Sequence, residues 1–211
     1  MKPLNGIKVI DLTHMLAGPY AGMVIADLGA EVVKVEPLVH GEMTRGLLKS
    51  DPDYSFKEFG AYFLTLNRNK KSVSLDLKSD EGLKVFYDLV KSADVVLNNF
   101  SAGVVKKLKV DFDSLKKINP RIITCSITGF GETGPHSARP AYDQIVQAYS
   151  GAMSITGPDA NTPTRAGIPI GDLGSGLYSV IGILAALLSR EQTNKGQHID
   201  MSLLDVQNSL L

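Results

Sequence analysis

The chain of 211 residues is long enough to bury one substantial core. Its 22 acidic and 22 basic residues balance, which argues against a dedicated nucleic-acid-binding protein, and 44% of its residues are hydrophobic, as in ordinary globular proteins. The single Cys125 lies in the apolar run IITCSI and is expected to be a buried thiol. A lone cysteine forms no internal disulfide, which fits a reducing compartment.

Neither a signal peptide nor a membrane span is expected. The N-terminal stretch MKPLNGIKVIDL turns polar too early for a secretory signal. The most apolar window, Leu177 to Leu188, is shorter than the roughly 20 residues that cross a bilayer. We therefore expect a cytoplasmic protein without a membrane partner.

The N-terminal part predicts a parallel βαβ unit. A strand is expected at residues 7–12 (IKVIDL), a helix from Gly18 to about Gly29, and a second strand at residues 30–36 (AEVVKVE). The sequence holds neither a GxGxxG dinucleotide fingerprint nor a P-loop. The loop after the first strand carries His14 instead, which is either a hydrogen-bonded surface residue, the commoner case, or a catalytic group.

Residues 37–60 mix proline, glycine and charge without periodicity, and long loops of this kind tend to be functional or mobile. A basic turn then holds Arg68, Lys70 and Lys71, which are either solvated charges or phosphate ligands. The alternating segment SVSLDL that follows predicts a strand at residues 72–77.

The middle of the chain predicts a helix from Ser79 to Ser92, because Ser79 is a good cap and two acidic residues follow it. A third parallel strand is expected at residues 94–100 (DVVLNNF). A short helix at residues 101–109 (SAGVVKKLK) has N–H groups that can bind an anion, and another helix is expected at residues 113–118.

The last third predicts a strand at residues 121–130 (RIITCSITGF), a helix at residues 142–151 (YDQIVQAYSG), a strand at residues 198–203 (HIDMSL) and a final helix from residue 204. Turn-rich loops connect these elements. The whole predicts one doubly wound α/β domain with a mainly parallel sheet of about five or six strands.

Candidate binding residues fall at one edge of that sheet. Ligands of doubly wound sheets bind outside the carboxyl ends of the strands. His14, Asn99, Phe100 and the loop at residues 129–134 all follow strands directly, so they are expected at this edge.

Residues 167–190 (GIPIGDLGSGLYSVIGILAALLSR) predict a long helix. Apolar residues recur there at three- and four-residue steps, and we expect these to face the core: Leu173, Tyr178, Ile181, Leu184, Ala185 and Leu188. Asp172 falls at the N-cap or first turn, and Gly171, Gly174 and Gly176 leave its surroundings open to a ligand. Asp172 is either an ordinary cap, the commoner case, or a nucleophile kept ionised by the helix N-terminus.

The chain stops at Leu211, early in its final helix, and this apolar ending carries no cap. We expect either a longer natural chain or a partner chain that supplies the remainder.

Six segments in register along the whole chain resemble the class III CoA-transferases, the group that includes formyl-CoA and carnitine CoA-transferases and α-methylacyl-CoA racemases. They are GIKVIDLTHMLAGP with LGAEVVKVE, LNRNKKSVSLDLKSDEG, ADVVLNNFSAG, ITGFGETGP, YDQIVQAYSG, and GDLGSGLYSVIGILAALLSREQTNKGQHIDMSLLD. Family members are considerably longer. The resemblance implies that residues 1–211 are the N-terminal part of a large Rossmann-like CoA-binding and catalytic domain, without the small domain and return segment, and that complete chains form interlocked homodimers.

The resemblance places the family's nucleophilic aspartate on Asp172. It implies transfer of coenzyme A between an acyl-CoA and a small carboxylic acid through an aspartyl-CoA thioester on that residue. All reactants share one oxidation level, so no metal and no permanently bound cofactor is implied, and acyl-CoA is a substrate. The residues that the resemblance implies for CoA binding are His14, Ala17, Arg68, Asn99, Phe100 and Lys107, the last in place of a family arginine.

Two departures from the family pattern bear on the reaction. Leu16 stands where formyl-CoA transferase has glutamine, which favours a bulkier or more apolar acyl group. Tyr142 stands where the racemases have a catalytic histidine, and a phenol with a pKa of about 10 is a poor proton shuttle. Tyr142 stays a catalytic candidate, and Asp143 beside it is expected to be a structural hydrogen-bond acceptor. The alternative functions are therefore an α-methylacyl-CoA racemase, and a CoA-binding subunit that is inactive without a partner chain.

Overall fold

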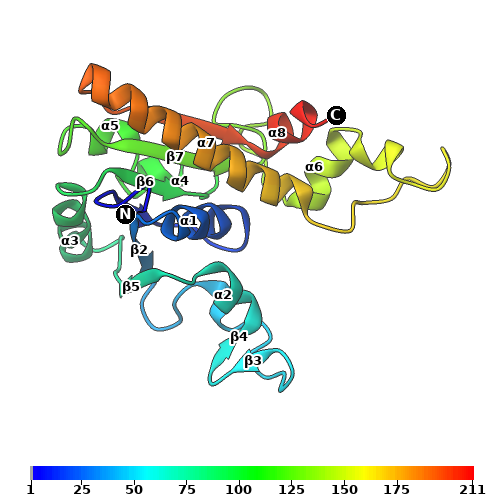
Figure 1. Ribbon diagram of the computed structural model, residues 1–211, viewed down its shortest axis with the longest axis horizontal. Coiled ribbons are helices and arrows are strands. Elements are labelled where there is room, and N and C mark those ends of the chain that lie inside the picture. The colour runs from blue at the N-terminus through cyan, green and yellow to red at the C-terminus, as the bar shows by residue number, and fades with distance from the viewer. Residues whose placement is uncertain (1) are drawn as a thin grey trace.

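The computed structural model describes residues 2–211 (Figure 1). Its main sheet has six strands in the order β5-β2-β1-β6-β7-β8, and every neighbouring pair is parallel. The strands are β1 (Lys8–Asp11), β2 (Glu31–Glu36), β5 (Lys70–Ser74), β6 (Val95–Asn98), β7 (Ile123–Thr128) and β8 (His198–Ser202). The predicted doubly wound α/β fold is confirmed. The strand order reverses between β1 and β6, which makes the carboxyl ends of these two strands the expected ligand site.

Helices cover both faces of the sheet, since successive strand residues point to opposite sides. On one face lie α1 (Ala17–Asp27), α6 (Asp143–Tyr149), α7 (Ile170–Thr193) and α8 (Leu203–Ser209). The other face carries α3 (Asp80–Val90), α4 (Val104–Lys107) and α5 (Phe112–Leu115). Val9 belongs to the first core and Ile10 to the second. Cys125 is buried in the first core as predicted, and burial raises the pKa of its thiol to about 12.

The irregular segment at residues 37–60 projects from the sheet together with the helix that follows it (Figure 1). It contains the short 3₁₀ helix η1 (Met43–Arg45) and a hairpin of β3 (Ser55–Phe56) and β4 (Phe59–Gly60), and it leads into α2 (Ala61–Leu66). A second 3₁₀ helix, η2 (Ala152–Ile155), follows α6.

The strand after α2 begins two residues earlier than predicted, because Lys70 and Lys71 of the expected basic turn pair with β2. The last three residues of the predicted strand, 75–77, lie beyond its end at Ser74. Ser79 caps α3 as predicted, since its hydroxyl accepts a hydrogen bond from Gly82 N–H.

Helix α7 buries a different face from the one predicted. Ile181 and Leu188, expected in the core, are 60% and 72% exposed. The buried face consists mostly of small residues: Gly171, Ser175, Gly176, Ser179, Val180, Ile183, Ala186, Leu187 and Arg190. A Cβ atom on Gly176 would lie 2.8 Å from the backbone oxygen of Ala17, so glycine here permits close packing on α1. The prediction was wrong because both faces of the helix are apolar. The face with the small residues is the buried one, since small side chains let α7 approach α1 more closely.

The length of α7 also exceeds the predicted apolar window. Within residues 2–211 it is the one helix that could cross a membrane by length and composition. In the structure it packs against α1 and β7. The core of the sheet therefore accounts for the apolar residues on its buried face, whereas Ile181 and Leu188 stay exposed.

Candidate active site

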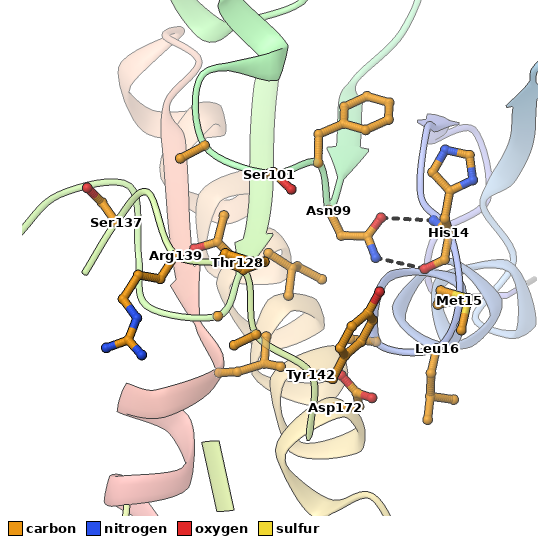
Figure 2. Close-up of a pocket in the computed structure, with 18 of the residues that line it drawn as sticks. His14, Met15, Leu16, Asn99, Ser101, Thr128, Ser137, Arg139, Tyr142 and Asp172 are labelled. Atoms are coloured by element: carbon orange, nitrogen blue, oxygen red, sulfur yellow. Dashed lines mark hydrogen bonds between the residues drawn. The ribbon is translucent and has the colours of Figure 1, made fainter. Parts of the chain in front are cut away.

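A hollow of about 240 Å³ opens at the carboxyl ends of β1, β6 and β7 (Figure 2). Segments far apart in the sequence form its wall: the start of α1 with the loop before it, α2, the turn after β6, the loop after β7, and the first turn of α7. Six of the eight predicted site residues line it: His14, Ala17, Asn99, Phe100, Tyr142 and Asp172. The hollow therefore lies at the reversal of strand order, where doubly wound folds bind ligands.

Asp172 lies in the first turn of α7 but does not cap it. The cap position is Pro169, which has no side-chain hydrogen bond to offer. Asp143 takes over this role from α6: its Oδ1 accepts hydrogen bonds from Gly171 N–H at 2.8 Å and from Asp172 N–H at 3.4 Å. The interpretation of Asp172 as a helix cap is wrong, whereas the expected acceptor role of Asp143 is confirmed. The Asp172 carboxylate is thus free to face the hollow.

The pKa of Asp172 is raised from 3.8 to about 6, first by burial of the carboxylate and then by the negative charge of Asp143. The helix N-terminus alone predicts an ionised carboxylate, and it does not predict this rise in pKa. A pKa of about 6 leaves the carboxylate ionised at neutral pH and makes it more basic than a solvated carboxylate. A more basic carboxylate is a better nucleophile.

Two of the glycines around Asp172 serve helix packing rather than ligand approach. Gly171 and Gly176 are buried. A Cβ atom on Gly171 would lie 2.8 Å from the Val146 side chain of α6. The predicted opening of the backbone to a ligand is therefore not the reason for glycine at these two positions.

His14 and Asn99 are joined by a reciprocal pair of hydrogen bonds (Figure 2). His14 N–H donates to Asn99 Oδ1 at 2.8 Å, and Asn99 Nδ2 donates to His14 O at 2.7 Å. Asn99 thus fixes the loop after β1 to the end of β6. The Phe100 ring packs against the imidazole, with centroids 5.7 Å apart.

The imidazole of His14 is held in place by packing. Its Nδ1 atom is buried and has no hydrogen-bond partner among residues 2–211. Burial, and then the nearby Lys34 ammonium group, lower the pKa of His14, so the ring is neutral at neutral pH. An unpartnered nitrogen beside a hollow is a polar group that a ligand can satisfy.

Tyr142 precedes the first residue of α6, and its side chain is 71% exposed. Figure 2 shows it beside Asp172 on the same wall of the hollow. Ala17 is buried at the start of α1. Tyr142 and Ala17 each lie where a loop that leaves the sheet edge enters a helix.

Arg68 and Lys107 do not line the hollow within the described part of the chain. Arg68 forms an ion pair with Asp27 at the end of α1. Lys107 is the last residue of α4. Their predicted roles in binding CoA stay predictions.

A second hollow of about 320 Å³ adjoins the first and shares His14 and Phe100 with it. Its wall is largely apolar and includes three charged residues. The remaining lining residues are Leu12, Val35, Glu36, Pro37, Leu75, Asp76, Leu77, Lys78, Val104 and Leu108. Sequence reasoning missed this hollow, although LDLK directly after β5 falls at the same sheet edge.

Further residues of the first hollow were also missed. Tyr62 projects from α2, Thr128 ends β7, and Arg139 lies in the loop before α6. The negative charge of Asp172 contributes to raising the pKa of Tyr62, after burial, so the two groups interact. The sequence signal for Tyr62 was weak because α2 reads as a short apolar stretch.

Comparison with known proteins identifies the family. The profile described as CoA-transferase family III matches residues 4–211. The chain belongs to CoA-transferase family III.

Relatives in this CoA-transferase family are clearly similar to the chain. A succinate–glutarate CoA-transferase of Agrobacterium fabrum is 46% identical over 214 residues, covering 99% of this chain and 53% of that protein. The succinyl-CoA:glutarate CoA-transferase of Mus musculus is 44% identical, covering 100% and 48%. The crystal structure of a CAIB/BAIF family protein from Brucella suis superposes with a TM-score of 0.94 at 44% identity, covering 100% of this chain and 55% of that one. The chain therefore spans about half the length of these CoA-transferase relatives.

Proposed function

We propose that this chain supplies the nucleophile and the CoA-binding surface of a CoA-transferase, with Asp172 as the residue that captures the acyl group. One observation carries the proposal: a half-buried, unusually basic carboxylate lies on a hollow that also gathers His14, Asn99 and Phe100. Membership of CoA-transferase family III supports it.

In the proposed reaction CoA passes from the donor acyl group to the acceptor acid, and every step is a substitution at an acyl carbon. The ionised Asp172 carboxylate attacks the thioester carbonyl of the donor acyl-CoA, the C–S bond breaks, and a mixed anhydride and CoA thiolate result. The thiolate attacks the aspartyl carbonyl, which releases the donor acid and leaves an aspartyl-CoA thioester. The acceptor carboxylate then displaces the thiolate to form a second anhydride. Attack of the thiolate on the acceptor carbonyl yields the new acyl-CoA and restores Asp172.

The two adjoining hollows suit a long ligand. We propose that the adenosine part of CoA binds in the apolar hollow beside α4, with its phosphates near Lys78, which lines that hollow, and near Lys107, the last residue of α4. The pantetheine arm then passes His14 and Phe100, the wall shared by both hollows, and brings the thioester to Asp172. Arg68 already has Asp27 as a partner, so Lys78 is the better candidate for a phosphate contact.

For the acyl group we propose a short dicarboxylic acid. Leu16 lines the hollow and offers apolar surface to a chain longer than formyl, and Arg139 supplies a cation for a second carboxylate. The two relatives described above are named as CoA-transferases of succinate or succinyl-CoA and glutarate. A formyl-CoA:oxalate CoA-transferase of Streptomyces coelicolor, 44% identical, makes formyl transfer the competing specificity.

Trapping the covalent intermediate tests the proposal. Incubation with succinyl-CoA followed by hydroxylamine is expected to convert Asp172 to a hydroxamate, detected by mass spectrometry of its peptide. Asp172→Ala, which lacks the carboxylate, is expected to give neither adduct nor transfer. CoA-transfer activity that survives in Asp172→Ala would contradict this mechanism.

Two other functions make different predictions. A racemase exchanges the α-hydrogen of an acyl-CoA with solvent deuterium without an acceptor acid, whereas a CoA-transferase needs the acceptor. A CoA-binding subunit binds CoA but transfers nothing until a partner chain is added.

The assembly is also a proposal. We propose that residues 1–211 form the N-terminal part of a large CoA-binding domain, and that the complete enzyme is an interlocked homodimer or contains a partner chain with the other half. The relatives' greater length supports the first part of this proposal, that the complete enzyme needs another half.

A further inference from the structure

The loop between β1 and α1 is held by polar groups from several elements. Lys34 Nζ donates to Thr13 O at 2.7 Å, and Asn99 binds both backbone groups of His14. Met15 N–H donates to Glu42 Oε1 at 2.9 Å. His14 and Met15 both line the first hollow, so these contacts fix its wall.

Met15 has a left-handed backbone conformation, with φ of 66°. This region is unfavourable for a residue with a Cβ atom, and methionine lacks the short polar side chain that helps asparagine or aspartate adopt it. Without restraint the residue would relax toward a negative φ. Since His14 directly precedes it, such relaxation would move the imidazole out of its present position.

Glu42 supplies the restraint on Met15 from outside the βαβ unit. Its side chain is fully buried at 0% exposure. One carboxylate oxygen accepts the Met15 N–H and the other accepts the Thr44 hydroxyl. A buried carboxylate is costly to desolvate, and an apolar side chain would pack there at lower cost. Packing alone therefore does not explain a glutamate at this position.

The segment that carries Glu42 is itself anchored to the sheet. Glu42 N–H donates to Glu36 Oε2 at 2.8 Å. Glu36 in turn accepts two hydrogen bonds from the Arg45 guanidinium, each at 2.6 Å, and one from Ser72 at 2.5 Å. The position of the Glu42 carboxylate is thus set by β2, β5 and η1 together.

We propose that Glu42 is a positioning residue for CoA binding: it holds Met15 in the left-handed turn that keeps His14 on the wall of the hollow. It acts through the loop and does not touch the ligand. The inference rests on the proposed function, because it takes CoA as the ligand of this hollow. It also assigns a role to the start of the segment at residues 37–60, because the anchoring of Glu42 and Arg45 to Glu36 becomes a condition for binding.

Isothermal titration of CoA into the 211-residue chain tests the proposal with matched variants. Glu42→Gln keeps an oxygen that accepts the Met15 N–H, and its NH₂ group can donate a hydrogen bond to the Thr44 hydroxyl. Its dissociation constant for CoA is expected to lie within about threefold of the wild-type value. Glu42→Met fills the same space without an acceptor, and is expected to weaken binding about tenfold. Thermal unfolding of each variant shows whether it is folded.

A second substitution separates positioning from general stability. Met15→Gly removes the steric penalty of the left-handed conformation, so it is expected to restore part of the lost affinity in the Glu42→Met background. If Glu42 contributed only to general stability, Met15→Gly would not restore CoA affinity in the Glu42→Met background. If Glu42→Met does not fold, Glu42→Leu, which is smaller and also lacks an acceptor for Met15 N–H, takes its place and is expected to weaken binding about tenfold.

The outcomes are distinct. Weakened binding that Met15→Gly partly restores supports the proposal. Wild-type affinity in Glu42→Met, or a loss that Met15→Gly leaves unchanged, overturns it. A wild-type chain that does not bind CoA contradicts the proposed function instead. In that case the amide exchange rate of Met15, expected to rise in Glu42→Met and not in Glu42→Gln, still tests the restraint by Glu42, and an unchanged rate overturns it.

Discussion

The carboxylate of Asp143 accepts a hydrogen bond from the backbone N–H of Asp172 at 3.4 Å, and from that of Gly171 at 2.8 Å. Asp143 therefore caps the first turn of helix α7, a role that Asp172 itself does not fill. The same carboxylate contributes to raising the pKa of Asp172 to about 6, after the larger effect of burial. One residue thus fixes the nucleophile in place and makes it more basic.

The first prediction concerns this pair. Asp143→Asn keeps the Oδ1 acceptor but removes the negative charge, so the pKa of Asp172 is expected to fall while burial holds it above 3.8. Transfer requires the ionised carboxylate, so activity rises with pH through this pKa. The acidic limb of the kcat/KM profile is therefore expected to move to lower pH. An unchanged limb, or a shift to higher pH, would show that Asp143 does not act on Asp172 in this way.

The second prediction concerns the buried Asp11 below the His14 loop. Burial alone would raise the pKa of Asp11, but Lys34 and Lys70 outweigh it and hold the pKa at about 2. Because this value lies below the unfolded one, the stabilisation is complete above about pH 4 and is lost as pH falls toward 2. The loss amounts to roughly 2 kcal/mol of unfolding free energy.

Urea unfolding between pH 2 and 6 measures this effect, with those limits chosen to bracket the ordinary carboxyl pKa of about 4. Asp11→Asn is expected to be less stable at neutral pH and to depend less on pH in the acidic range. Equal slopes for the two proteins would contradict the assignment.

The third prediction concerns the second hollow. Val104→Trp is expected to fill part of the space that we assign to adenosine, because Val104 lines that hollow and not the first. The KM for succinyl-CoA should rise by about tenfold, the cost of a lost apolar contact of this size. Turnover of the short thioester succinyl-N-acetylcysteamine, which lacks the nucleotide, should not change. An equal loss with both substrates would place the nucleotide elsewhere.

The fourth prediction concerns packing of α7. A Cβ atom on Gly176 meets the backbone of α1 at 2.8 Å, whereas one on Gly182 meets only the Ile199 side chain, at 3.3 Å. Gly176→Ala should therefore destabilise the protein by about 1–3 kcal/mol, since backbone cannot move aside cheaply. Gly182→Ala should change stability by less than about 1 kcal/mol, because the gain in helix propensity offsets a small side-chain shift. Equal effects in thermal unfolding would contradict the close contact.

Local sequence signals predicted the strands of the sheet and the first-turn position of Asp172 well. Apolar runs such as AEVVKVE and IITCSI leave few alternatives to a buried parallel strand. Because parallel strands end at one edge, His14 and Asn99 could be expected together there, and their hydrogen bonds join them.

The signals that failed depend on contacts across the fold. Asp143 lies 28 residues from the Gly171 N–H that it binds, and Arg68 lies 41 residues from Asp27. Neither partner can be read from spacing. The buried face of α7 was mispredicted because Leu and Ile on its outer face give the stronger periodic pattern, while Gly and Ser make the closer contact.

The central claim is that Asp172 becomes covalently acylated in each turnover. The most direct measurement follows heavy oxygen from a labelled acceptor carboxylate during transfer from succinyl-CoA. In the proposed sequence the acceptor oxygen bridges the second anhydride and remains on the aspartyl carbon when the thiolate leaves with the acceptor's acyl group. Mass spectrometry is therefore expected to find the label in the Asp172 carboxylate after turnover. Full transfer with no label on that residue would contradict the account.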